Sequence, residues 1–184
     1  INAQLQMREY ETFYGFAYNA AMNGDSGQVL SLIASTRIVS SDAITNHISD
    51  NAEMADILDT KSPSLKAARM QAYYDRSEQT FTRADVRIDG IFGGIAKAMK
   101  DNGFDEQGTF LKAHDNYKVA RTAFFDLRKA EYKTFFDKVN ANGFKDRAES
   151  GAAWKAVQDK VFAAYDTLAN DVRTINDRAD KVFA

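Results

Sequence analysis

The chain of 184 residues has no cysteine and only two histidines, His47 and His114. The absence of cysteine excludes disulfide bonds, thiolate nucleophiles and zinc–thiolate sites. It suits a bacterial periplasmic domain, although many cytosolic proteins share it. The histidines do not form the Glu-x-x-His pairing of a di-iron bundle, since Ile44 and Leu111 stand three residues before them. We therefore expect no metal site and no cofactor.

Proline is almost as scarce, because Pro63 is the only one in the chain. Proline breaks helix interiors, and strand-rich folds have many turns that use it, so its scarcity favours long helices. The chain also lacks an apolar run long enough to cross a bilayer and a signal peptide.

The charge and motif content exclude further classes of function. The net charge is −2, with acidic and basic residues interspersed, so no basic surface for nucleic acid is predicted. No Walker loop, dinucleotide fingerprint or catalytic constellation occurs. We expect a protein that is not an enzyme and has no catalytic residues.

Short clusters of helix-breaking residues divide the chain into helical segments. Gly24, Gly103 and Gly143 suit the left-handed position after a helix, and Ser62 suits an N-cap before Pro63. Asp105 and Asp146 are further N-cap candidates. The pattern predicts helices over residues 1–22, 28–59, 63–101, 105–140 and 146–183.

The last segment repeats apolar residues every seven positions, as helices in bundles and coiled coils do. Its first row is Trp154, Val161, Leu168, Ile175 and Val182, and its second row is Gln158, Tyr165, Val172 and Ala179. Comparable rows occur in the three preceding segments. One of these runs through Leu30, Arg37, Ile44, Asn51 and Leu58, with Ala34, Ser41, Ile48 and Ala55 beside it.

Four helices of nearly equal length, joined by short polar loops, predict an all-α fold. We expect an up-and-down four-helix bundle over residues 28–184, within one domain of 1–184. The aromatic-rich residues 1–23 predict an additional N-terminal helix or an extension of the next one. Gly90, Gly93 and Gly94 lie inside a helical pattern, which indicates close helix approach or a local weakening rather than phosphate binding.

Three arginines on or beside the apolar rows are candidate ligand contacts. Arg37 occupies an apolar row, where an isolated charge is costly. His114, Arg121 and Arg128 repeat at seven along a core edge. One interpretation pairs these cations with Asp and Glu of neighbouring helices, or spreads their stems over the core. The other has Arg37, with Arg121 or Arg128 from a facing helix, clamp a small carboxylate or phosphate.

The run Ser35-Thr36-Arg37-Ile38, the near-equal helices and the heptad-patterned final helix resemble one family. They are similar to the extracytoplasmic sensor domain of bacterial chemoreceptors, the methyl-accepting chemotaxis proteins of the four-helix-bundle class. Amino-acid-binding members carry three arginines along the first helix. Arg37 matches the first of them, but Asp42 and Asn46 stand in the other two places, so amino-acid specificity is not carried over.

This resemblance implies a periplasmic signal-sensing domain, a homodimer joined to the membrane by flanking transmembrane helices. Its ligand would be a small molecule, such as an organic anion, held between helices, and binding would shift a helix towards the membrane. The chain begins at Ile1, and the apolar rows of its last helical segment run almost to Ala184, so we expect a piece of a longer or processed protein. The alternative is a structural or protein-interaction bundle of a secreted or surface protein.

Overall fold

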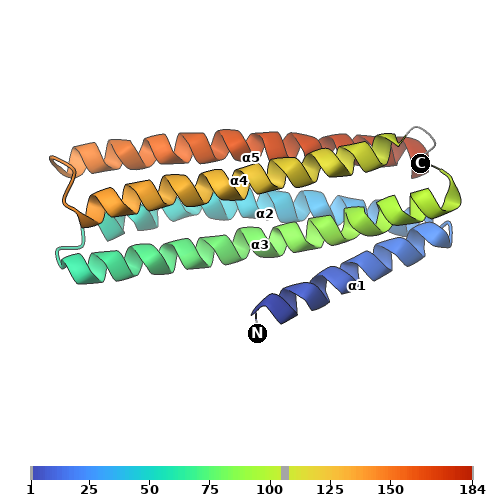
Figure 1. Cartoon of the computed structure of the whole chain (residues 1–184), viewed down its shortest axis with the longest axis horizontal. Helices are drawn as coiled ribbons and strands as arrows, with labels where there is room; N and C mark the ends of the chain where they lie inside the picture. Colours follow the sequence, from blue (N-terminus) through green and yellow to red (C-terminus); the bar gives the residue numbers. More distant parts are fainter. Residues whose placement is uncertain (1, 105–107, 184) are drawn as a thin grey trace.

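The computed structural model describes the backbone of residues 2–104 and 108–183, and the side chains of residues 3–36, 52–104 and 108–183. Within these ranges the fold is all-helical, without strands (Figure 1). The helices are α1 (Asn2–Met22), α2 (Ser26–Leu58), α3 (Pro63–Asn102), α4 (Thr109–Asn140) and α5 (Arg147–Phe183). The predicted fold class, an all-α helical bundle, is confirmed.

Helices α2 to α5 run up and down, and each packs against two of the other three helices of this bundle (Figure 1). Helix α2 contacts α3 and α5, and α4 contacts the same two helices from the other side. The turn around Gly24 separates α1 from α2, so α1 is a helix of its own. It lies outside the four-helix bundle, along α3 and in the same direction (Figure 1).

The helix ends follow the capping chemistry at most of the predicted positions. Pro63 begins α3, and the Ser62 hydroxyl accepts the Leu65 N–H. Gly24 and Gly103 adopt φ of 68° and 70°, the left-handed values expected after a helix.

Two predicted helix boundaries differ from the structure or lie outside its description. Gly143 does not take the left-handed conformation, because Asn142 takes it with φ of 51°. The Asp146 carboxylate accepts the Glu149 N–H, as an N-cap should. Asp105 lies outside the described residues, and α4 begins after Gly108.

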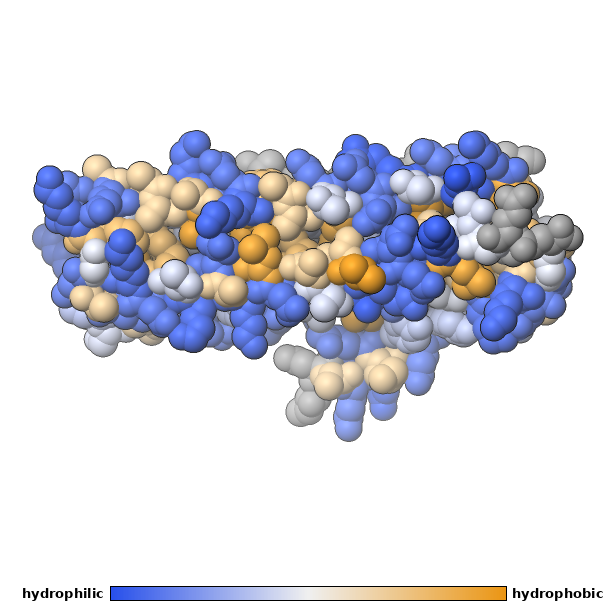
Figure 2. Space-filling model, turned by 45° about the horizontal axis from the view of Figure 1, so that its top comes forward, coloured by the Kyte–Doolittle hydropathy of each residue, from blue (hydrophilic) through white to orange (hydrophobic). Residues whose placement is uncertain are grey.

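The apolar rows of α5 face the core, with one exception. Ile175 is fully buried, Trp154 and Val161 are almost so, and Leu168 is half-buried. Val182 is 46% exposed, contrary to expectation, because Phe183 packs against the core in the last turn instead. Figure 2 shows hydrophilic residues over much of one face, with hydrophobic patches between them.

The buried face of α2 lies one residue earlier than the predicted row. Val29, Ile33 and Thr36 are buried there, whereas Leu30 is half-buried and Ala34 is exposed. This set keeps the helical spacing of four and three residues, so the predicted period is right. The buried row lies one residue earlier over this part of α2, whereas Leu58 of the predicted row is buried as expected. The side chains of residues 37–51, including Arg37, lie outside the described residues.

The α1–α3 contact depends on the glycines of α3. Of the two predictions made for these glycines, close helix approach and local weakening, the structure confirms close approach. A Cβ atom at Gly94 would lie 2.4 Å from the Tyr14 carbonyl oxygen, and one at Gly90 would lie 3.0 Å from that of Tyr10. The absence of these Cβ atoms lets the two backbones approach closely. None of the helices described has the length and apolarity that a membrane crossing requires.

Candidate functional site

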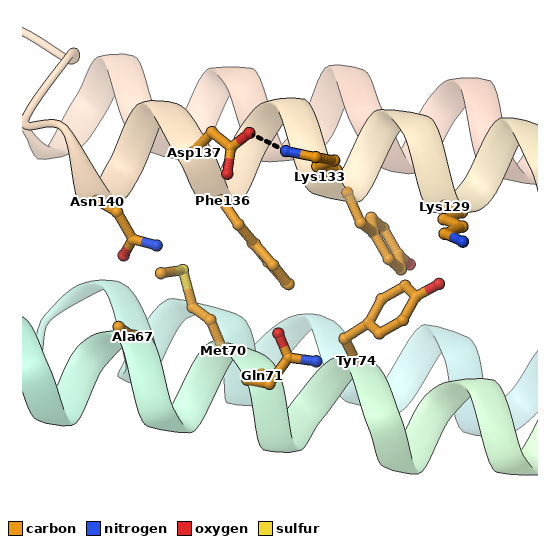
Figure 3. A pocket seen from close by; sticks show the side chains of 10 residues that line it. Ala67, Met70, Gln71, Tyr74, Lys129, Lys133, Phe136, Asp137 and Asn140 are labelled. Carbon is orange, nitrogen blue, oxygen red and sulfur yellow. Dashed lines mark hydrogen bonds and ion pairs between the residues drawn. The ribbon is translucent and has the colours of Figure 1, made fainter.

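A pocket of about 350 Å³ opens between α3 and α4 (Figure 3). Its α3 side consists of Ala67, Met70, Gln71 and Tyr74, and its α4 side of Lys129, Tyr132, Lys133, Phe136, Asp137 and Asn140. Met70 points across the gap towards α4, Phe136 points from α4 into the gap, and Tyr74 points towards the end of the gap near Lys129 (Figure 3). The volume is at the lower end of the range for ligand pockets, which implies a small occupant.

Three aromatic rings form the apolar wall of this pocket. The rings of Tyr132 and Phe136 stack at 6.0 Å with an angle of 17° between their planes. Tyr74 stands edge-on to Tyr132, at 5.7 Å and 82°. Edge-on and offset-stacked arrangements are the favourable ones for aromatic pairs, so these rings hold one another in place.

Two lysines of α4 supply positive charge at the rim. Lys129 and Lys133 are four residues apart on α4, and both are among the residues that line the pocket. The Lys133 side chain runs along the helix towards Asp137 (Figure 3). The Lys133 ammonium lies 2.6 Å from the Asp137 carboxylate, and both side chains are exposed. Among the described residues no ion pair is seen for Lys129. The rim therefore carries two cations against one carboxylate.

Arg128 lies behind the inner end of the pocket and is only 1% exposed. Its guanidinium donates to the Ser77 hydroxyl at 2.6 Å and to the Glu78 carboxylate at 3.3 Å. The same group lies 4.9 Å from the ring centre of Tyr74 and 4.7 Å from that of Tyr132. Because both rings also line the pocket, Arg128 fixes part of the pocket wall.

Unpartnered polar atoms lie next to this wall. The Tyr132 hydroxyl, the Arg128 Nε and both amide atoms of Gln158 are buried without a hydrogen-bond partner. Burial raises the pKa of Tyr132, and the nearby Arg128, Tyr73 and Gln158 oppose that rise. Buried polar groups of this kind are usually satisfied by water or another partner. Arg128 and Gln158 lie behind the wall and are not part of the pocket lining.

A second polar cluster joins α3 and α4 nearer the middle of the molecule. Tyr117 donates to the Asp85 carboxylate at 2.5 Å, and His114 Nε2 lies 2.9 Å from Asp89 Oδ1. Arg121 lies 3.7 Å from Asp85 and 3.3 Å from Asp89. The cluster is largely buried, so it ties the two helices together by charge and hydrogen bonding.

The pKa values of the two carboxyl groups in this cluster, Asp85 and Asp89, are shifted in opposite directions. Burial raises the pKa of Asp85 to about 6, against the Tyr117 hydrogen bond and the Arg121 charge. Burial also acts to raise the pKa of Asp89, but the His114 hydrogen bond and the Arg121 charge outweigh it and lower the pKa below its usual value. Asp85 is thus the carboxylate that takes up a proton near neutral pH.

The three arginines predicted from the sequence fall into two groups. Arg37 lies outside the described side chains. Arg121 and Arg128 are both paired with acidic residues of α3, as the interpretation by interhelical pairing requires, and neither lines the pocket. Their direct contact with a ligand stays a prediction.

Sequence reasoning missed the pocket itself. Lys129 and Lys133 carried the one usable signal, since they lie four residues apart beside the aromatic rows of α4. The described side chains contain no group of three metal-ligating residues placed to hold a metal ion. No protein-family model, curated protein sequence or solved structure matches this chain.

Proposed function

We propose that this chain is the ligand-sensing domain of a transmembrane receptor of the chemoreceptor type, and that it performs no catalysis. Its ligand is a small organic anion, which binds between α3 and α4. The domain works as a homodimer on the periplasmic side of the membrane, with transmembrane helices flanking it. The observation that carries this proposal is the pocket beside Arg128, with its aromatic wall and lysine rim.

The packing of α4 on α5 supports the signalling part of the proposal. The Phe135 and Trp154 rings lie 5.3 Å apart, and those of Phe124 and Tyr165 lie 5.5 Å apart. A ligand that displaces α4 therefore pushes on a rigid aromatic contact with α5. Sliding of packed helices by about 1–2 Å is a recurrent switching motion. Helix α5 is the element that would pass such a shift towards the membrane.

A second candidate function is a protein-interaction bundle. Three large apolar side chains of α1, Leu5, Met7 and Phe16, are each about half exposed. Exposed apolar groups are a feature of docking surfaces. Under this alternative the α3–α4 pocket has no ligand, and small molecules leave the stability of the domain unchanged.

Thermal denaturation with a panel of small organic anions separates the two candidates. A ligand of the native state raises the melting temperature with the logarithm of its concentration. The pocket variant is Ala67→Met, which fills space at the lining, and its control is Ala68→Met, which places the same side chain on the exposed face of α3.

The sensing proposal requires a rise in melting temperature that is abolished in Ala67→Met and kept in Ala68→Met. A melting temperature unchanged by every anion would refute ligand sensing at this pocket and favour the interaction bundle. A rise that survives in both variants would place the ligand elsewhere.

A further inference from the structure

The lining of the α3–α4 pocket specifies its ligand more closely. We propose that the ligand is a small aromatic carboxylate, with its ring among Met70, Tyr74 and Phe136 and its carboxylate at Lys129 and Lys133. This inference rests on the proposed sensing function and narrows it to one chemical class.

The aromatic part follows from the geometry of the wall. Tyr74 stands perpendicular to Phe136 as well as to Tyr132, with ring centres 6.4 Å apart and 85° between the planes of Tyr74 and Phe136. A flat ring entering between α3 and α4 meets ring faces on one side and a ring edge on another, so it extends the arrangement already there. Met70 adds a polarisable thioether, which also makes favourable contacts with rings.

The carboxylate group of the proposed ligand is inferred from the charges at the rim of the pocket. Lys129 and Lys133 lie on one edge of the pocket, and only Lys133 has a partner among the described residues. That partner, Asp137, is 63% exposed, and exposed lysine–carboxylate pairs contribute little free energy. The Lys133 ammonium is thus available to a ligand at small cost. One carboxylate on the ligand balances the excess cation of the rim.

Arg128 is a positioning residue in this scheme rather than a ligand contact. Its guanidinium is occupied by Ser77 and Glu78, and its planar face rests on the rings of the pocket wall. The second buried cluster, around Asp85 and Arg121, is already paired and does not line the pocket. Recognition of the ligand anion therefore falls to the two lysines of the rim.

Calorimetric titration of the whole chain tests this inference with three probes. Benzoate carries both the ring and the charge, benzyl alcohol carries the ring alone, and hexanoate carries the charge on a flexible chain. The test variant is the double substitution Lys129→Gln and Lys133→Gln. The control is Lys155→Gln, because Lys155 pairs with Asp159 four residues on, as Lys133 does with Asp137, but on α5 and away from the pocket.

We expect benzoate to bind the wild type and the Lys155→Gln variant equally, and to bind the double variant about tenfold more weakly or worse. Benzyl alcohol and hexanoate should each bind the wild type about tenfold more weakly than benzoate. The three substituted lysines are all at the surface, so circular dichroism should show the same helical fold in every variant.

Three results would overturn the inference. The first is the absence of any heat of binding with benzoate. The second is that the double variant binds benzoate as tightly as the wild type does. The third is that the wild type binds benzyl alcohol as tightly as benzoate. If hexanoate binds and benzoate does not, with binding lost in Ala67→Met, the aromatic class is refuted while anion sensing stands. If no anion binds at all, the sensing proposal fails with it.

Discussion

Arg128 is among the largest fully buried side chains that the structure describes, and its charge is unusual for such a place. A buried charge is costly unless it is paired and hydrogen-bonded. Here Glu78 supplies the opposite charge and Ser77 a hydrogen-bond acceptor, while Tyr74, Phe81 and Tyr132 present ring faces. The long stem and flat guanidinium fill space that an apolar residue would otherwise occupy.

Substitution of Arg128 should separate its packing from its charge. Arg128→Ala removes the side chain from between three rings and should lower the free energy of unfolding by about 2–5 kcal/mol. Arg128→Met keeps most of the volume and should lose less than half as much, because Glu78 is partly exposed and can be solvated. Urea denaturation gives both values.

The exposed Arg76 provides the control for these variants. It pairs with Glu53 at the surface and is 54% exposed, so Arg76→Ala should change the free energy of unfolding by under about 1 kcal/mol. Equal losses for Arg76→Ala and Arg128→Ala would contradict the assignment of Arg128 to the core.

Asp85 should make stability depend on pH in a direction opposite to that of most carboxylates. Its pKa rises to about 6 in the folded chain, so between about 4 and 6 the native state binds more protons than the unfolded state. The contribution of Asp85 is therefore most favourable at low pH and is lost as the pH rises through about 6.

The variant Asp85→Asn removes this dependence and keeps an oxygen that can accept from Tyr117. Relative to the wild type, its free energy of unfolding should increase between pH 4 and pH 7, by up to about 3 kcal/mol. Urea denaturation at pH 4, 5, 6 and 7 measures the difference. Asp159→Asn, an exposed substitution on α5, is the control. Parallel profiles for Asp85→Asn and the wild type would show that Asp85 does not titrate in this range.

At the scale of elements, the contact between α1 and α3 has one decisive position. Gly94→Ala places a Cβ atom 2.4 Å from the Tyr14 carbonyl oxygen, a distance that backbone atoms cannot accommodate without a shift of α1. We expect α1 to separate from α3 and the chain to lose about 1–3 kcal/mol of stability. Faster hydrogen exchange confined to α1 would report the separation.

Gly15→Ala is the matched control for that variant. A Cβ atom at Gly15 meets nothing within 4 Å, so this substitution within α1 should stabilise the helix slightly. If Gly94→Ala behaves in the same way as Gly15→Ala, the glycines of α3 do not set the approach of α1.

The elements were predictable where local chemistry decides them. Pro63 with Ser62, and Gly24 with Gly103, mark helix ends because capping depends on neighbouring residues only. The row of α2 was misplaced because Val29 and Leu30 are equally apolar, and only the neighbouring helices select the buried one.

The candidate site was much less predictable than the elements. That Arg121 and Arg128 would lie on α4 beside aromatic residues followed from spacing in the sequence. Their partners on α3, Asp85, Asp89 and Glu78, depend on how two antiparallel helices are registered, which no local pattern determines. The pocket depends on the distance between α3 and α4, which the sequence does not give. Only the spacing of its two lysines could have indicated it from the sequence.

At the scale of the whole molecule, the bundle has two core clusters, and the pocket lies beside one of them. One core cluster includes Ile91, Ile95 and Ile175, and it is where α1 also packs. The other includes Tyr132, Phe135 and Trp154, and the pocket opens beside it. Under the proposed function, a ligand in the pocket beside the second cluster would move α4 and α5 relative to the part of the bundle that contains the first cluster.

Nuclear magnetic resonance of the methionine methyl groups tests the central claim, ligand binding between α3 and α4, most directly. The chain has five methionines, and of these Met70 alone lines the pocket. Met7 and Met22 are exposed on α1. Met54 and Met70 belong to one core cluster and Met99 to the other. We predict that benzoate shifts the Met70 methyl resonance, through the ring current of the bound aromatic group, and leaves those of Met7 and Met22 in place. A Met70 resonance that stays unchanged at saturating benzoate, or five resonances that move together, would contradict a ligand site between α3 and α4.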